Sequence, residues 1–166
     1  MAYVDKIGGG VMFFTKKREY PIIDSKYKLS NYGELLNDTF DGGEQLFLGK
    51  NCRHVFIDLN SETLECYSIC AILGACSFSA VNYNIKNYAD VSLFYKNLVK
   101  PSAICTCEDF VLASYVDYNN RLILFGDISA EGDCYQFFKD TYCIISNNEV
   151  KLFFIKVEND ILRYIK

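Results

Sequence analysis

The single histidine of this chain, His54, lies two residues after Cys52. An imidazole beside a thiol can accept its proton and so turn the sulfur into a nucleophile. The two residues stand at the start of an expected strand, however, and no flanking motif is typical of a cysteine hydrolase. The pattern therefore favours a structural histidine, and no catalytic residue is predicted.

Metal chemistry would depend on the cysteines, of which the chain has eight. Cys105 and Cys107 would share one face of a strand, and four thiolates can bind zinc tetrahedrally. Cys66 and Cys70 are four residues apart, and the usual C-x2-C spacing does not occur. These cysteines also have mainly apolar neighbours. We therefore expect reduced, mostly buried thiols, and predict no metal and no cofactor.

Two aspartates, Asp58 and Asp117, occupy matching places in two expected hairpins. Paired carboxylates can divide acid and base roles in hydrolysis. Aspartates next to turns more often accept hydrogen bonds from the backbone. Both are therefore expected to be structural.

Acidic residues are unevenly distributed along the chain. Between Lys28 and Lys50, and again between Arg121 and Lys139, there is no lysine or arginine. These stretches carry the seven residues predicted to bind a partner: Glu34, Asp38, Asp41, Glu44, Asp127, Glu131 and Asp133. The first three would share one face of a helix. The simpler interpretation is a solvated face that aids solubility. The sharper one is an acidic surface that docks a basic protein.

The clearest structural signal is a hairpin within residues 110–129. A turn is expected at Asn119-Asn120, because asparagine tolerates the positive φ that a two-residue turn requires. Val116 would then face Ile123. Since both faces of this hairpin are largely apolar, we predict that it is central and covered on both sides.

The remaining chain is expected to alternate helices and hairpins. Predicted helices are Ser30–Phe40 and Asn87–Lys100, which Asn31 and Asn87 can cap, and Asp133–Lys139. Further strands are predicted at Gln45–Leu48, His54–Leu59, Leu64–Cys70, Tyr142–Ser146, Val150–Val157 and Ile161–Ile165, with turns at Asn147-Asn148 and Asn159-Asp160. The predicted fold class is α+β: an antiparallel sheet built of hairpins, with two or three helices packed against it and a possible internal helix-hairpin repeat.

Composition limits the classes of function. The chain, 1–166, is expected to form a single domain. Its net charge of −4 lacks the basic field that binds phosphate backbones, so no direct nucleic-acid partner is expected. No export signal is visible, and no apolar run approaches the roughly 20 residues of a membrane helix. A cytoplasmic location is therefore expected.

These features lead to one hypothesis and two alternatives. The hypothesis is a non-enzymatic acidic binding protein of the immunity or inhibitor type, which neutralises a basic partner such as a nuclease toxin. The first alternative is a small-molecule-binding domain or small enzyme, with a tyrosine-lined pocket that gathers Tyr115, Asp117 and His54. The second is a structural subunit, which would expose an extensive apolar surface.

Overall fold

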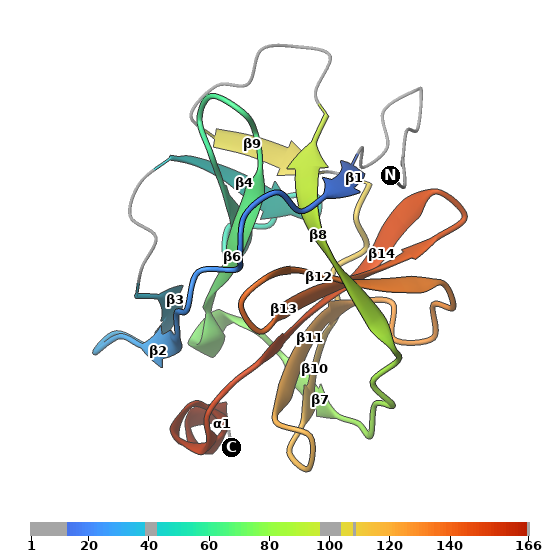
Figure 1. Ribbon diagram of the computed structural model, residues 1–166. Coiled ribbons are helices and arrows are strands. Elements are labelled where there is room, and N and C mark those ends of the chain that lie inside the picture. The colour runs from blue at the N-terminus through green and yellow to red at the C-terminus, as the bar shows by residue number, and fades with distance from the viewer. Residues whose placement is uncertain (1–12, 39–42, 97–103, 108, 166) are drawn as a thin grey trace.

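The computed structural model describes residues 13–38, 43–96, 104–107 and 109–165. Within these residues the chain forms strands, one short 3-10 turn (Leu73–Ala75) and one helix, α1 (Asn159–Ile165). The strands are arranged in two sheets, and α1 follows the last of them (Figure 1). The predicted α+β fold with two or three helices is therefore wrong, and the protein is mainly β.

The larger sheet contains eight strands: β1 (Phe13–Lys17), β7 (Phe78–Ala80), β8 (Tyr88–Tyr95), β10 (Ser114–Asp117), β11 (Leu122–Gly126), β12 (Asp133–Phe138), β13 (Thr141–Ser146) and β14 (Glu149–Lys156). Their spatial order is β1-β8-β12-β13-β14-β11-β10-β7. Pairing is antiparallel except between β8 and β12 and between β7 and β10.

The smaller sheet contains six strands: β2 (Tyr27–Leu29), β3 (Glu34–Asn37), β4 (Glu44–Leu48), β5 (Val55–Leu59), β6 (Cys66–Ile72) and β9 (Ile104–Cys107). Their order is β2-β3-β6-β5-β4-β9, and only β4 and β9 are parallel. Figure 1 shows β8 as a long strand that extends from the β1 end of the larger sheet towards β12.

Alternating burial explains why these segments are strands. In β5, Val55, Ile57 and Leu59 are fully buried, whereas Phe56 and Asp58 are partly exposed. This two-residue period is that of a sheet with one face on the core. Strand β14 differs, because residues 152–155 are all buried and both of its faces are covered.

The main core lies between the two sheets and draws buried side chains from both. A polar contact also joins the sheets inside it. The hydroxyl groups of Tyr27 and Thr141 share a hydrogen bond of 2.6 Å, and the Ile69 N–H donates to the same Tyr27 oxygen at 3.1 Å. Because Thr141 belongs to the larger sheet and the other two residues to the smaller one, this network ties the sheets together.

A second hydrophobic cluster covers the other face of the larger sheet. Tyr83, from the connection between β7 and β8, lies with its ring 5.5 Å from that of Phe154. The ring of Tyr142 stacks on Phe154 at 4.9 Å. This cluster keeps the centre of the larger sheet out of water on the side away from the main core.

The predicted central hairpin, β10–β11, is confirmed. Val116 pairs with Ile123 as expected, and its two faces contribute to the two hydrophobic clusters. The turn is different from the prediction. It spans residues 118–121, and the positive φ, 57°, falls on Arg121 instead of on Asn119-Asn120. The predicted Asn147-Asn148 turn between β13 and β14 is confirmed, with φ values of 52° and 60°.

None of the three predicted helices forms in the described residues, and strands stand in their places. Residues 30–38 of the predicted Ser30–Phe40 contain a turn and β3, residues 87–96 of Asn87–Lys100 contain β8, and Asp133–Lys139 contains β12. The ends of the first two, 39–40 and 97–100, lie outside the described residues. In β3, buried Leu35 and Asn37 alternate with partly exposed neighbours, so sheet pairing prevails over the apparent helical spacing. The predicted cap, Asn31, does not begin a helix; instead the hydroxyl of the preceding residue, Ser30, accepts the Glu34 N–H and so closes a turn. The helix-then-hairpin repeat is consequently wrong.

The predicted strand Ile161–Ile165 is the helix α1, so Asn159-Asp160 begins a helix and is not a hairpin turn. The Glu158 carbonyl accepts the N–H groups of Ile161 and Leu162. Ile161 and Ile165 are one helical turn apart and both contact the main core. The apolar residues of this short run fit the period of a strand as well as that of a helix. Packing against the main core selects the helix.

Candidate functional site

The first acidic stretch lies on the β2–β3 hairpin and does not form a helix face. Glu34 and Asp38 lie on the same side of β3 because strand side chains alternate, and Asp38 is exposed. Two exposed lysines lie on the facing segment. The backbone N–H of Lys26, just before β2, donates to the Asp38 carboxylate at 3.1 Å, and Lys28, in β2, pairs with Leu36. Positive charge therefore accompanies this acidic stretch in space, although not in sequence.

The other two predicted residues of this stretch do not extend it. Glu44 begins β4 opposite Leu59 and is only partly exposed. Its Oε2 atom is buried and has no hydrogen-bond partner among the described residues. Asp41 lies outside the described residues. The structure thus leaves Glu34 and Asp38 as the described acidic pair of this hairpin.

The second acidic stretch runs from the connection between β11 and β12 to the first residue of β12, and we call its three acidic residues the acidic connection: Asp127, Glu131 and Asp133. All three residues are exposed, as a docking surface requires. The Asp127 carboxylate accepts the Ser129 hydroxyl at 2.6 Å and the Ser129 N–H at 2.9 Å. These two bonds lower the pKa of Asp127 below its usual value, because they stabilise the charged carboxylate.

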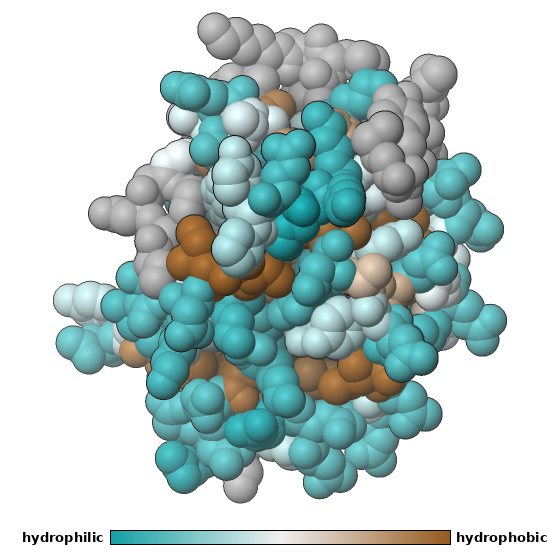
Figure 2. Space-filling view, in the orientation of Figure 1, coloured by the Kyte–Doolittle hydropathy of each residue, from teal (hydrophilic) through white to brown (hydrophobic). Residues whose placement is uncertain are grey.

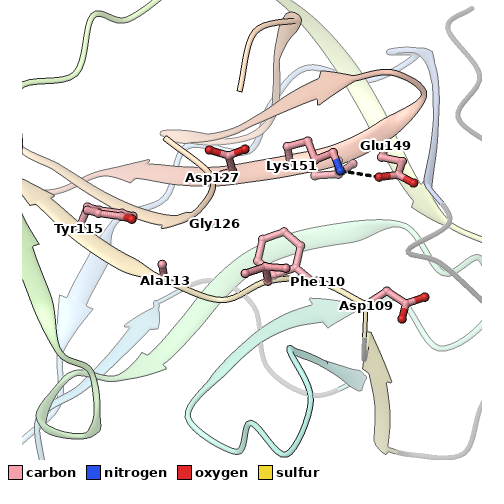
Figure 3. A pocket seen from close by; sticks show the side chains of 10 residues that line it. Asp109, Phe110, Ala113, Tyr115, Gly126, Asp127, Glu149 and Lys151 are labelled. Carbon is pink, nitrogen blue, oxygen red and sulfur yellow. Dashed lines mark hydrogen bonds and ion pairs between the residues drawn. The ribbon is translucent and has the colours of Figure 1, made fainter. Parts of the chain in front are cut away.

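A pocket of about 310 Å³, the acidic pocket, adjoins this connection (Figure 3). Its lining comes from β10 and the segment before it, from the end of β11 with the residue after it, and from the start of β14: Asp109, Phe110, Val111, Ala113, Tyr115, Gly126, Asp127, Glu149, Val150 and Lys151. In Figure 3 the side chains of Asp127, Lys151 and Glu149 lie along one wall, and Phe110 lies on the other. The pocket therefore has a charged side and an aromatic side.

The charges of the acidic pocket do not balance. Lys151 supplies one ammonium group, and its Nζ is 2.6 Å from Glu149 Oε2. Asp109 and Asp127 add two more carboxylates to the lining. A cation with an apolar stem would satisfy both the excess acid and the aromatic side, because Phe110 and Tyr115 offer ring surface.

Gly126 sets the geometry of this end of the sheet. Its φ is +123°, a backbone conformation that side chains rarely adopt. A Cβ at this position would collide with the Lys151 carbonyl oxygen and lie 2.9 Å from the Phe110 ring. Glycine therefore allows the close approach of β11 to β14 that brings Asp127 beside Lys151.

A second pocket, of about 400 Å³, lies beside the connection between β4 and β5. Cys52 and His54 both line it, and Cys52 Sγ is 3.8 Å from His54 Nδ1. Phe110 and Ala113 line both pockets, so the segment before β10 separates them. The alternative site of Tyr115, Asp117 and His54 is not assembled, since Tyr115 lines the acidic pocket, His54 lines this one and Asp117 lines neither.

The two hairpin aspartates have opposite environments. Burial raises the pKa of Asp58, whose carboxylate accepts the Ser68 hydroxyl at 2.8 Å. Burial would also raise the pKa of Asp117, but the N–H groups of Tyr83 and Asn120, at 2.7 and 3.0 Å, outweigh it and lower that pKa. The expected backbone-binding role is confirmed for Asp117, whereas the bonds described for Asp58 come from side chains.

Six of the seven cysteines whose side chains are described are buried, as expected: Cys52, Cys66, Cys70, Cys107, Cys134 and Cys143. Cys105 is not among them. Across the described ranges, no set of three or more histidine, cysteine or acidic side chains is placed to hold a metal ion. The helical part of the described chain includes no segment with the length and apolar character needed to cross a membrane.

Sequence reasoning found the acidic connection but missed Asp109, Glu149 and Lys151. Glu149 and Lys151 join it through the pairing of β11 with β14, which places Gly126 opposite Leu152. Asp109 joins it through the segment that leads into β10, the other neighbour of β11. The signal that could find part of the pocket is the two-residue period of a strand, which puts Ala113 and Tyr115 on one side of the chain that enters β10.

No known protein-family model matches this sequence, and no curated protein shows significant similarity to it.

Proposed function

We propose that this chain is a non-enzymatic acidic binding protein that docks a basic protein through the acidic connection. The observation that carries the proposal is the gathering of exposed Asp127, Glu131 and Asp133 beside a pocket that itself has excess acid. Such a surface attracts a basic partner over a distance and orients it on arrival. Phe110 and Tyr115 supply apolar contact for the stem of an inserted lysine or arginine.

An inhibitor of the immunity type, which occludes a nuclease toxin in the cytoplasm, is the specific form of this proposal. Nucleases bind a polyanion, so their active faces are commonly basic. Figure 2 shows a mainly hydrophilic face on which hydrophobic residues form separate small areas. That pattern suits a transient complex better than a permanent subunit interface, which is usually more hydrophobic.

Inhibition assays test this proposal. The wild-type chain, mixed in equal amounts with purified basic nucleases, is expected to inhibit at least one of them. The neutral variant Glu131→Gln/Asp133→Asn should lose that inhibition without unfolding, because both side chains are exposed. If the wild-type chain leaves every basic nuclease active while retaining affinity for a deca-arginine peptide, the inhibitor function is wrong and only the docking surface remains.

The second candidate is a small-molecule-binding domain or small enzyme. The acidic pocket favours it, because about 310 Å³ and a Tyr115 wall suit a small cation. A thermal-shift screen with arginine methyl ester and spermidine distinguishes the two. Stabilisation that Asp127→Asn abolishes, together with inactivity towards all basic nucleases, would favour the small ligand.

A further inference from the structure

The second pocket differs in charge from the rest of this acidic chain. Its lining is Gly49, Lys50, Asn51, Cys52, His54, Ala75, Ser77, Phe110, Leu112, Ala113 and Ser114. That lining includes an ammonium group and an imidazole, and no carboxylate among the described residues. The pocket therefore suits an anionic ligand, whereas the acidic pocket on the other side of residues 110–113 suits a cation.

A thiol and an imidazole meet inside this pocket. Cys52 Sγ is 3.8 Å from His54 Nδ1, a distance at which sulfur can hydrogen-bond to nitrogen. The thiol also lies 3.8 Å from the Val55 carbonyl oxygen. An imidazole in this position can take the thiol proton, and the thiolate that remains is the reactive form of cysteine.

The backbone holds this pair in place. Gly49 has φ +100° and Asn51 has φ +58°, so the chain turns back before it enters β5. The Cys52 N–H donates to the Gly49 carbonyl at 3.3 Å, and the Gly49 N–H donates to the Cys107 carbonyl at 3.0 Å. These contacts hold Cys52 against the pocket. Cys52 and His54 lie before β5 and therefore not in the regular strand geometry that the sequence suggested.

Other cysteines have surroundings that suppress reactivity. Burial raises the pKa of Cys134 and of Cys76 to about 11. It raises the pKa of Cys66, Cys70 and Cys143 further, and none of the five lines either pocket. Among the seven cysteines whose side chains are described, Cys52 is the one that combines a pocket, an imidazole and a neighbouring ammonium group.

Two cationic residues, Lys50 and Arg53, lie close to Cys52 in the sequence, and they differ in their position relative to the pocket. Lys50 lines the pocket. The Arg53 guanidinium instead lies 5.7 Å from the centre of the Phe47 ring, and Arg53 does not line the pocket. Lys50 can therefore bind the carboxylate of a ligand that Arg53 does not reach.

We propose that Cys52 is a nucleophilic modification site that forms mixed disulfides with small anionic disulfides. His54 accepts the thiol proton, and the Cys52 thiolate attacks one sulfur of the ligand. The new S–S bond forms as the old one breaks, and the departing thiolate leaves with the electron pair and takes the proton from His54. Cys52 is oxidised and half of the ligand is reduced, so no further oxidant is needed. Lys50 holds the ligand carboxylate.

The test compares dithiodiglycolate, which is anionic, with bis(2-hydroxyethyl) disulfide, which is neutral. Intact mass and peptide mapping should show Cys52 modified first, at least about tenfold faster than any other thiol. His54→Asn should slow the reaction of Cys52 with both probes by about tenfold. Lys50→Ala should slow only the anionic probe, by roughly fivefold, and Arg53→Ala should change neither rate appreciably.

Several outcomes would overturn this inference. They are earlier modification of another cysteine, equal rates in wild type and His54→Asn, or equal losses in Lys50→Ala and Arg53→Ala. Unchanged thermal unfolding of the variants shows that a lost rate is not a lost fold. The site is separate from the acidic connection, so none of these results depends on the proposed docking function.

Discussion

The acidic stretch that follows Lys28, which places Glu34 and Asp38 on the β2–β3 hairpin, looks like the acidic connection in sequence, since each stretch has several acidic residues and no lysine or arginine. In space they differ. Lys26 contacts Asp38 through its backbone, and Lys28 lies on the same hairpin, so the first stretch is accompanied by positive charge. The acidic connection instead adjoins further carboxylates, Asp109 and Glu149, which outnumber Lys151. Charge along a strand is thus set by the neighbouring strand as much as by the segment itself.

The largest difference in stability is expected between two alanine substitutions. One is at Gly126, which precedes the acidic connection, and the other is at Gly33, which precedes Glu34. Gly126→Ala forces a side chain onto the Lys151 backbone at φ +123° and should cost about 3 kcal/mol or more. Gly33 has φ +77°, but its added Cβ would meet the far end of the Tyr164 side chain, which can move. Gly33→Ala should cost roughly 1 kcal/mol. Urea unfolding measures both, and a greater loss in Gly33→Ala would contradict the rigid geometry assigned to the acidic connection.

An effect of intermediate size on stability is expected from two hairpin aspartates, Asp58 in the smaller sheet and Asp117 in the larger one. The pKa of Asp117 is lowered on folding, so its contribution is present above about pH 4, the unfolded value, and is lost as pH falls through the folded pKa. The pKa of Asp58 is raised, so its contribution is present below the unfolded value and is lost as pH rises through the folded pKa.

Urea midpoints measured from pH 2.5 to 7 resolve these opposite slopes. Asp117→Asn should flatten the loss of stability on the acid side, and Asp58→Asn should flatten the loss above about pH 4. If both variants change the pH dependence of the urea midpoint on the same side of pH 4, the opposite pKa shifts assigned to Asp117 and Asp58 are wrong.

The smallest effect should come from removing the lysines of the β2–β3 hairpin. Lys26→Gln/Lys28→Gln leaves Glu34 and Asp38 with less positive charge nearby. Affinity for a deca-arginine peptide at low salt should rise by no more than about threefold, because exposed charges interact weakly. A gain of more than tenfold would show that these lysines conceal a docking surface on that hairpin.

Local chemistry explains which parts of the fold were predictable. The Asn147-Asn148 turn and the Val116–Ile123 pairing depend on residues close in sequence, and both were predicted. The predicted helices failed because β3, β8 and β12 gain their stability from distant partners. The parallel pairing of β8 with β12, for example, joins Tyr88 to Cys134. No local pattern reports such a contact.

The candidate site also has a part that the sequence predicts and a part that it does not. Asp127, Glu131 and Asp133 lie close together in sequence, among serine and glycine residues, so their exposure could be expected from the sequence. Their neighbours could not, because Asp109 and Glu149 reach the acidic pocket through separate strands. The lysines beside Asp38 were missed for the same reason.

The most direct measurement compares two charge reversals of equal size. Glu131→Lys/Asp133→Lys changes the acidic connection, and Glu34→Lys/Asp38→Lys changes the β2–β3 hairpin. Titration against a deca-arginine peptide should show at least about a tenfold loss of affinity for the first variant and less than about threefold for the second. Circular dichroism controls for folding. Equal losses, or a greater loss in the second variant, would contradict the claim that the acidic connection is the docking surface.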